Sequence, residues 1–209
     1  MTQIFEIHPE TPQLRLVRQA ARMIRSGALV VYPTDTTYAL GCGLGEKDAL
    51  DRIRQLRNLD ARHNFTLACR DLSDIGVYAK VEKTAYRLLK AFTPGPYTFV
   101  LRATSEVPRR LQHAKKKTIG IRVPDHAITR ALLEELGEPL MTASLLLPGE
   151  DIPMTDAADI AEAIGKQVDL VIDGGACGME PSTVVDLSSG VPEVLRAGCG
   201  DVSAFGEES

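Results

Sequence analysis

The sequence predicts an α/β fold, a single domain in which helices flank a twisted sheet of mixed parallel and antiparallel strands. Short apolar runs of strand length alternate along the chain with segments of helical periodicity. The last two apolar runs are separated only by the short turn Ser188-Ser189-Gly190, which requires an antiparallel pair and so excludes a purely parallel sheet. No Pro/Gly/Ser-rich linker divides the 209 residues, a length that suits one large domain.

The first half of the chain predicts helices and strands in turn. Residues 13–26 form a helix, because apolar residues recur at helical spacing and Gly27 then ends it. The apolar run 28–32 is a buried strand, and residues 47–56 carry the helical periodicity again. Strands are then expected at residues 65–69 and 98–102, with a helix at 83–91 between them.

The second half continues the alternation. Strands are expected at residues 118–123, 140–147 and 168–173, and helices at 127–136 and up to Ile164. Either Thr155 or Asp156 caps the start of that last helix. Strands at 183–187 and 193–196 form the closing antiparallel pair.

Composition excludes several classes of protein. The hydrophobic fraction of 44% and the charged fraction of 25% are those of a globular protein, not of a disordered or fibrous one. No apolar run approaches the roughly 18 residues of a membrane-spanning helix, and the first residues lack a secretory signal pattern. The four cysteines are far apart, which argues against a disulfide scaffold or a structural zinc site. We therefore expect a soluble, cytoplasmic protein.

Charge is distributed unevenly along the chain. Residues 1–130 hold 22 of the 24 Lys and Arg and have a charge balance of +10, whereas residues 131–209 have a balance of −14. Such asymmetry indicates a basic surface that attracts an anion, nucleic acid being the obvious candidate. The alternative is that the two halves neutralise each other in the folded protein.

Two basic clusters are the candidate RNA-binding residues. One is a stripe of four arginines on the first helix, and the other is a group of five basic residues in a predicted loop. The residues are Arg15, Arg18, Arg22 and Arg25 in the stripe, and Arg109, Arg110, Lys115, Lys116 and Lys117 in the loop. Neither cluster carries interleaved aromatic residues, so an RNA contact would be to the backbone and its shape.

Common catalytic motifs are absent from the sequence. Gly41-x-Gly43-x-Gly45 has the wrong spacing for a dinucleotide loop, and acidic residues follow it where a phosphate would lie. We interpret it as a flexible turn, with cofactor binding as the alternative. There is no P-loop sequence. The four histidines show neither metal-ligand spacing nor a neighbouring Gly-x-Ser-x-Gly elbow.

Five motifs place Thr, Ser or Arg near the ends of apolar strands. They occupy residues 32–38, 93–98, 118–124, 181–186 and 196–198. Because α/β sheets build their sites at strand ends, these motifs indicate a small-molecule site. Each taken alone also fits a turn or a cap, a common role for Thr, Ser, Pro and Gly.

Together, over about residues 22–200, these motifs resemble the YrdC/YciO family, the L-threonylcarbamoyladenylate synthases. The Arg-His-Asn-Phe-Thr-Leu stretch at 62–67 and residues 144–149 are most similar to the YciO branch. The resemblance implies one YrdC-like domain over residues 1–209 with a basic concave face. It implies a nucleotidyltransferase that makes threonylcarbamoyl-AMP from L-threonine, bicarbonate and ATP, with Mg²⁺, for tRNA threonylcarbamoyladenosine modification. It also implies binding of double-stranded RNA or tRNA, and no membrane partner.

The resemblance also implies site residues. Arg122 would hold the threonine carboxylate bidentately, and Arg196 would contact a nucleotide phosphate. The implied substrate-binding residues are Thr34, Thr36, Arg122, Thr142 and Ser182, and the nucleotide-binding ones are Arg57, Thr118, Ser144 and Arg196, with Arg57 and Ser144 also catalytic. The alternatives are a structural ion pair for each arginine and a turn or cap for each Thr or Ser.

The sequence departs from the synthases in two residue pairs. Their Lys-x-Arg pair is Arg57-Asn58-Leu59 here, and their Ser-x-Asn pair is Ser144-Leu145-Leu146. His63 stands where the synthases often have Lys. Losing one preorganised polar contact costs about 2.7–4 kcal/mol of transition-state stabilisation. Two hypotheses follow: an enzyme of the synthase type, slow or with a related substrate, or an RNA-binding protein that has lost the synthase activity.

Overall fold

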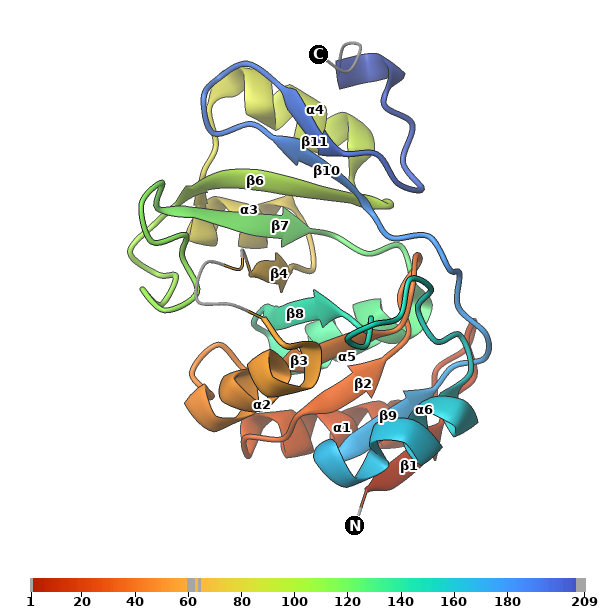
Figure 1. Ribbon diagram of the computed structural model, residues 1–209. Coiled ribbons are helices and arrows are strands. Elements are labelled where there is room, and N and C mark those ends of the chain that lie inside the picture. Colours follow the sequence, from red (N-terminus) through yellow and green to blue (C-terminus); the bar gives the residue numbers. More distant parts are fainter. Residues whose placement is uncertain (1, 60–62, 64, 206–209) are drawn as a thin grey trace.

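All strands that the structure describes join one sheet (Figure 1). The computed structural model describes residues 2–59, 63 and 65–205. The strands are β1 (Gln3–Glu6), β2 (Val30–Tyr32), β3 (Ala39–Cys42), β4 (Thr66–Ala68), β5 (Ala79–Lys80), β6 (Tyr97–Ala103), β7 (Thr118–Arg122), β8 (Leu140–Ser144), β9 (Leu170–Asp173), β10 (Thr183–Asp186) and β11 (Glu193–Arg196). Their order across the sheet is β1-β9-β2-β3-β8-β4-β7-β6-β10-β11, and β5 pairs with β6 off this path.

The pairing confirms the predicted mixed sheet. β9 lies parallel to β1 and β2, β4 is parallel to β7, and β6 is parallel to β10. The pairs β2–β3, β3–β8, β8–β4, β6–β7 and β10–β11 are antiparallel. The Ser188-Ser189-Gly190 turn joins β10 to β11 as expected, with Gly190 at a φ of 87°.

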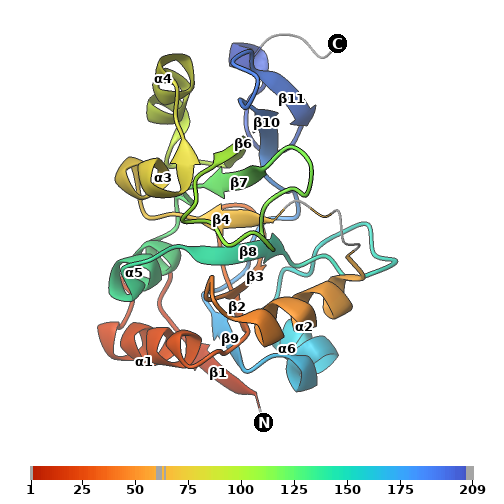
Figure 2. The same ribbon diagram turned by 90° about the vertical axis from the view of Figure 1, so that its left-hand side faces the viewer.

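Helices cover the two halves of the sheet differently. They are α1 (Leu14–Arg25), α2 (Lys47–Arg57), α3 (Leu72–Tyr78), α4 (Lys83–Phe92), α5 (Ala127–Leu136) and α6 (Ala157–Ile164). In Figure 2, α1, α5, α3 and α4 lie on one side of the sheet, and α2 and α6 lie on the other. The face of β4, β7, β6 and β10 that is turned away from α3 and α4 carries no helix of the described chain, and the candidate site lies there.

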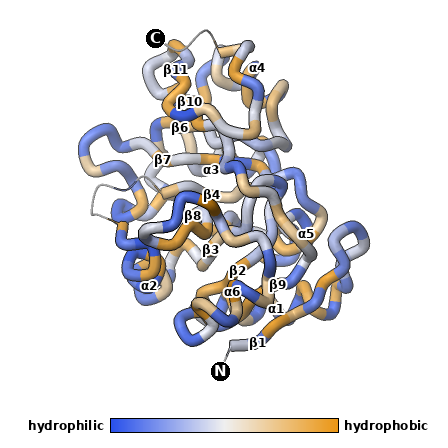
Figure 3. The backbone as a smooth tube through the Cα atoms, turned by 45° about the vertical axis from the view of Figure 1, so that its right-hand side comes forward, coloured by the Kyte–Doolittle hydropathy of each residue, from blue (hydrophilic) through white to orange (hydrophobic). Residues whose placement is uncertain are grey.

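Amphipathic patterning explains this packing. The helices alternate hydrophobic and hydrophilic residues along the tube in Figure 3. α1 buries Val17, Ala20, Ala21 and Ile24 against the sheet, in agreement with the apolar residues at helical spacing that predicted the helix. Gly27 follows at a φ of 90°, a left-handed conformation that glycine tolerates and that ends the helix.

The N-terminus of α6 is capped by one of the two predicted residues. The Asp156 carboxylate accepts hydrogen bonds from the backbone N–H groups of Ala158, at 2.8 Å, and Asp159, at 3.2 Å. The cap is therefore Asp156 and not Thr155, because the side chain of Asp156 satisfies two of the donors that an α-helix leaves free at its start.

Five elements differ from the prediction. Gly41 does not belong to a flexible turn: it lies inside β3, opposite Val30 and Thr142. A Cβ at Gly41 would lie 2.7 Å from the Tyr32 ring, so the glycine serves close packing between strands. β8 ends at Ser144 rather than at residue 147, and β1, β3, α3 and β5 were not predicted.

The basic and acidic parts of the sequence interleave in the sheet. β9 lies between β1 and β2, and β8 lies between β3 and β4. Three ion pairs join the parts: Arg18–Glu135 at 3.5 Å, Arg52–Asp169 at 2.7 Å and Lys116–Asp186 at 3.9 Å. Mutual neutralisation therefore accounts for part of the charge asymmetry.

Within the described residues, no helix combines the length and the apolar character needed to cross a bilayer.

Candidate functional site

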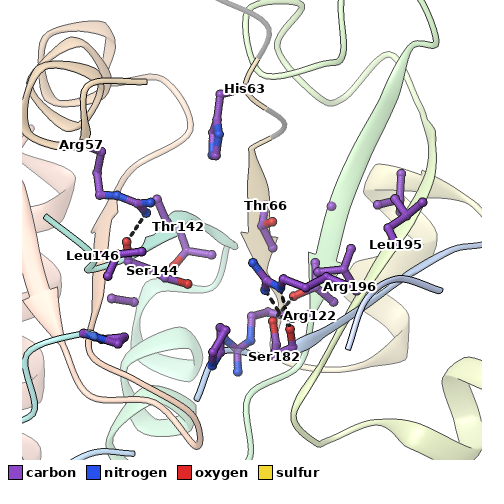
Figure 4. A pocket seen from close by; sticks show the side chains of 18 of the residues that line it. Arg57, His63, Thr66, Arg122, Thr142, Ser144, Leu146, Ser182, Leu195 and Arg196 are labelled. Carbon is purple, nitrogen blue, oxygen red and sulfur yellow. Dashed lines mark hydrogen bonds between the residues drawn. The ribbon is translucent and has the colours of Figure 1, made fainter. Parts of the chain in front are cut away.

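A cavity of about 280 Å³, here called the central pocket, opens on the helix-free face of the sheet (Figure 4). Residues distant in sequence converge on it from α2, β4, β6, β7, β8, β10 and β11. Arg57, Ser144 and Leu146 lie on one side, and Arg122, Ser182 and Arg196 lie on the other. Four of the five predicted motifs supply residues to the pocket lining, and the motif at residues 32–38 supplies none.

Arg122, at the end of β7, is the most firmly held of the pocket arginines. Its Nη2 donates to the Asp35 carboxylate at 2.5 Å, and both Nη atoms lie 3.3 Å from the Thr36 hydroxyl. The side chains of Arg122 and Asp35 are only 7% and 10% exposed. Because Asp35 fixes the guanidinium on one edge, the rest of the planar group is preorganised to bind a carboxylate or phosphate.

Arg57 and Arg196 are bound to main-chain oxygens and form no ion pair among the described residues. Arg57, in the last turn of α2, donates to the Ser144 carbonyl, and Arg196 Nη2 donates to the Ser182 carbonyl at 2.7 Å. Burial, and then the neighbouring Arg196, lowers the pKa of Arg57. Burial, and then Arg122, lowers the pKa of Arg196. An anion in the pocket would relieve this repulsion between cations.

Hydroxyl groups between the arginines are oriented by buried partners. The Tyr32 hydroxyl donates to Thr142 Oγ1 at 2.7 Å, and burial raises the pKa of Tyr32 to about 12, so that it remains a donor. Thr142 accepts that bond and keeps its own proton free to donate. On the other side, the hydroxyls of Thr98 and Ser182 lie 2.8 Å apart.

Six of the nine predicted site residues line the pocket. They are Arg57, Arg122, Thr142, Ser144, Ser182 and Arg196. Thr34 and Thr36 lie behind Arg122: Thr34 donates to the Thr37 carbonyl at 2.6 Å, the turn role that was its alternative, and Thr36 contacts the guanidinium. Thr118 is buried at the start of β7, four residues from Arg122, and does not line the pocket.

The structure separates the two predicted RNA-binding clusters. α1 lies in the helix layer with α5 (Figure 2), where Arg18 pairs with Glu135, and Arg25 donates to the Glu135 and Leu136 carbonyls. The remaining stripe residues, Arg15 and Arg22, are exposed. The loop cluster lies beside the start of β7, and there Arg110 is engaged with the Leu44 and Gly45 carbonyls. Arg109 and Lys115–117 are exposed.

Sequence reasoning missed several pocket residues. Thr66, Asp151, Met179 and Leu195 also line it. Gly120 lies in the pocket floor, where a Cβ would stand 2.5 Å from Thr66 Oγ1, so glycine leaves room there. Gly120 lies within the predicted motif 118–124, and Thr66 begins the internal strand β4, whereas Asp151 and Met179 come from loops and Leu195 from the edge strand β11.

The residues that depart from the synthases occupy different places. Leu146 and His63 line the pocket, whereas Leu59 packs against the hydrophobic core beyond the end of α2. Arg62 and Asn64 of the resembling stretch lie outside the described residues. The polar-to-leucine change at 146 therefore alters the pocket wall directly.

Comparison with known proteins identifies the family. The Sua5/YciO/YrdC family model, whose description is telomere recombination, matches residues 22–198. The chain belongs to this family. It is 52% identical to YciO of Escherichia coli K12 over 98% of the chain and 100% of that protein, and the YciO crystal structure superposes with a TM-score of 0.95.

Synthases of the family are more distant relatives. The threonylcarbamoyl-AMP synthase of Pyrococcus abyssi is 35% identical over 87% of this chain, which spans 54% of that protein. A crystal structure of Pyrococcus abyssi Sua5 complexed with L-threonine has a TM-score of 0.89 and 32% identity, and 59% of its length is covered. The chain thus matches YciO over its whole length and the synthases over about half of theirs.

Proposed function

We propose that this protein is a nucleotidyltransferase of the threonylcarbamoyl-AMP synthase type. The amino group of L-threonine and bicarbonate form a carbamate with loss of water. A carbamate oxygen then attacks the α-phosphorus of ATP, the bond to the β-phosphate oxygen breaks, and pyrophosphate leaves. The observation that carries the proposal is the convergence of Arg57, Arg122 and Arg196 around a small pocket lined with hydroxyls. A reaction between crowded anions needs alignment and positive charge more than a covalent nucleophile.

Each group in the pocket has a role in this proposal. Arg122, fixed by Asp35, holds the threonine carboxylate, while Thr142 and Ser182 donate to it or to the amino acid hydroxyl. Arg57 and Arg196 hold the phosphates, and Arg57 with Ser144 stabilises the charge that develops on the α-phosphate. The related Sua5 structure with L-threonine supports threonine as the amino acid.

The proposal includes Mg²⁺ bound to the phosphates of ATP. The described residues contain no group of three or more His, Cys, Asp or Glu side chains that could hold a metal ion. Asp151, in the pocket lining, is a carboxylate placed to contact a phosphate-bound Mg²⁺ or its water. Mg²⁺ would therefore enter with its nucleotide and neutralise phosphate charge, in a protein that we propose to be cytoplasmic.

The second candidate is an RNA-binding protein with lost or altered synthase activity, for tRNA or double-stranded RNA. Leu146 favours it, because an apolar side chain in the pocket wall cannot replace the hydrogen bonds of the Asn that the synthases carry there. The basic residues available for RNA are the exposed ones, Arg15, Arg22, Arg109 and Lys115–117.

The deciding experiment is synthesis of threonylcarbamoyl-AMP from ATP, Mg²⁺, L-threonine and labelled bicarbonate, detected by mass. Arg122→Lys keeps the charge but loses the bidentate geometry, and we expect the rate to fall about hundredfold. Arg130→Lys is the matched control, because Arg130 pairs with Asp125 on the surface, and its rate should equal that of the wild type.

The outcomes separate the candidates. Product that depends on Arg122 supports the synthase. ATP binding without product leaves a nucleotide-binding relative with another substrate. A protein that neither binds ATP nor forms product, but still binds RNA, supports the second candidate, the RNA-binding protein.

A further inference from the structure

A second hollow, of about 530 Å³, lies at one edge of the same sheet. It is formed by the end of β6, the loop before β7, and the turn between β10 and β11, which lie at the same edge in Figure 1. Its lining residues are Lys80, Arg102, Ala103, Lys116, Lys117, Asp186, Ser188, Ser189 and Glu193. None of these residues lines the central pocket.

Strand register shows that the two cavities share one face of the sheet. Side chains alternate between faces along a strand, so residues two apart point the same way. On β6, Thr98 and Val100 line the central pocket and Arg102 lines the second hollow. On β10, Val184 and Asp186 repeat this order. The hollow therefore continues the central pocket along the strands.

Positive charge dominates the exposed part of the hollow. Four of its side chains are basic and two are acidic. The Asp186 side chain is only 8% exposed, whereas Lys116, 3.9 Å from it, is 66% exposed. Lys80 and Lys117 form no ion pair among the described residues, while Arg102 Nε donates to the Ser188 carbonyl at 3.1 Å. The hollow thus presents four cations and two serine hydroxyls around a recessed carboxylate, Asp186, and one exposed carboxylate, Glu193.

The loop that carries the lysines is ordered by its own hydrogen bonds. His113 Nδ1 accepts from the backbone N–H groups of Lys115 and Lys116, at 3.2 and 3.0 Å. Lys117 has a φ of 55°, a left-handed conformation unusual for a lysine, and its backbone is bonded to His113 and Ala103. This backbone conformation favours glycine, so it does not explain why residue 117 is a lysine. Strained residues cluster at functional sites, and the lysine side chain lines the hollow.

We propose that the second hollow is a binding site for phosphate groups, distinct in position from the central pocket and open to it along the sheet face. Lys80, Lys116 and Lys117 would contact phosphate oxygens as point charges, and Arg102, braced by the Ser188 carbonyl, would complete the cradle. The phosphates belong either to a free polyphosphate group or to a nucleic acid backbone. The proposal does not depend on the reaction in the central pocket, and its nucleic acid form rests on the RNA binding proposed above as the second candidate function.

The test measures the binding of inorganic tripolyphosphate by calorimetry at low ionic strength. The parent is the full chain carrying Arg57→Gln and Arg196→Gln, so that the central pocket contributes little. Adding K80Q, K116Q and K117Q should weaken binding at least about tenfold. Adding K47Q, K90Q and K166Q, which removes the same charge from exposed sites outside both cavities, should change it less than about twofold.

A single variant separates loss of binding from loss of folding. Lys117→Gly removes the charge and suits the left-handed backbone, so the melting temperature should stay the same or rise while affinity falls. An equal loss of affinity in both triple variants, or in neither, would overturn the proposal.

A single-stranded RNA of eight nucleotides distinguishes the source of the phosphates. If the K80Q/K116Q/K117Q variant also binds the RNA more weakly, and the RNA competes with tripolyphosphate, the ligand is a nucleic acid backbone. If the variant loses affinity only for tripolyphosphate, the ligand is a free polyphosphate group.

Discussion

Leu146 is the residue at which the pocket departs most directly from a synthase. It lines the central pocket two residues beyond Ser144, on the same wall as Arg57. Leu146→Asn restores the side chain of the synthase pair, and an added hydrogen bond to a phosphate or ribose should raise the rate of threonylcarbamoyl-AMP formation roughly tenfold to hundredfold. Product formed per minute by the two proteins is the measurement.

The control for that change is Leu195→Asn, the same substitution on the opposite side of the pocket. It makes the pocket equally more polar but places no amide beside Ser144, so the rate should not rise. A rise in both variants, or in neither, would show that position 146 does not limit the reaction. Leu59→Arg is a weaker choice, because Leu59 packs against the core and its replacement would also cost stability.

His126 predicts a dependence of stability on pH. Burial lowers its pKa below the usual 6.5, and its Nδ1 has no hydrogen-bond partner among the described residues. The unfolded chain then binds a proton more readily than the folded one, so the free energy of unfolding falls as pH drops through 6.5 toward the lower folded pKa. His126→Gln should lose less stability than the wild type between pH 7 and pH 5 in urea titrations. Equal losses would contradict this.

At the scale of the element, the cap of α6 is the feature with the clearest energetic consequence. Asp156→Ala removes the acceptor of two backbone N–H groups and should lower the free energy of unfolding by about 0.5–2 kcal/mol. Asp156→Asn caps a helix about as well and should restore most of that stability. Urea unfolding of the three proteins is the measurement. If the Asn variant lost as much as the Ala variant, charge rather than capping would be responsible.

Elements with a strong pattern could be predicted, and those defined by pairing could not. α1, α2 and α5 carry a full apolar stripe, so helical spacing alone placed them within a residue or two. β3 contains two small or turn-forming residues, so its sequence predicts a loop. Its strand conformation comes from its pairing with β2 and β8. The same holds for the site: strand ends indicated Arg122 and Arg196, but only the fold brings Asp151 from a loop to the same pocket.

At the scale of the whole molecule, the central pocket depends on the complete sheet. Its walls come from α2 near residue 57 and from β11 near residue 196, with β7 and β8 between them. The three arginines come from elements 139 residues apart in sequence, from residue 57 to residue 196, and their charges repel one another. A bound anion should therefore stabilise the native state as a unit, because it binds only when the sheet is assembled.

Saturating Mg·ATP should accordingly raise the melting temperature. At a ligand concentration 100 times Kd the added stability is about 2.7 kcal/mol, or roughly 5–10 °C for a chain of this size. The double variant R57Q/R196Q should abolish most of the rise, since both groups that hold the phosphates are gone. R87Q/R130Q removes the same charge from exposed helix positions outside the pocket and should keep the full rise. An equal effect of the two pairs would mean that net charge, and not the pocket, attracts the nucleotide.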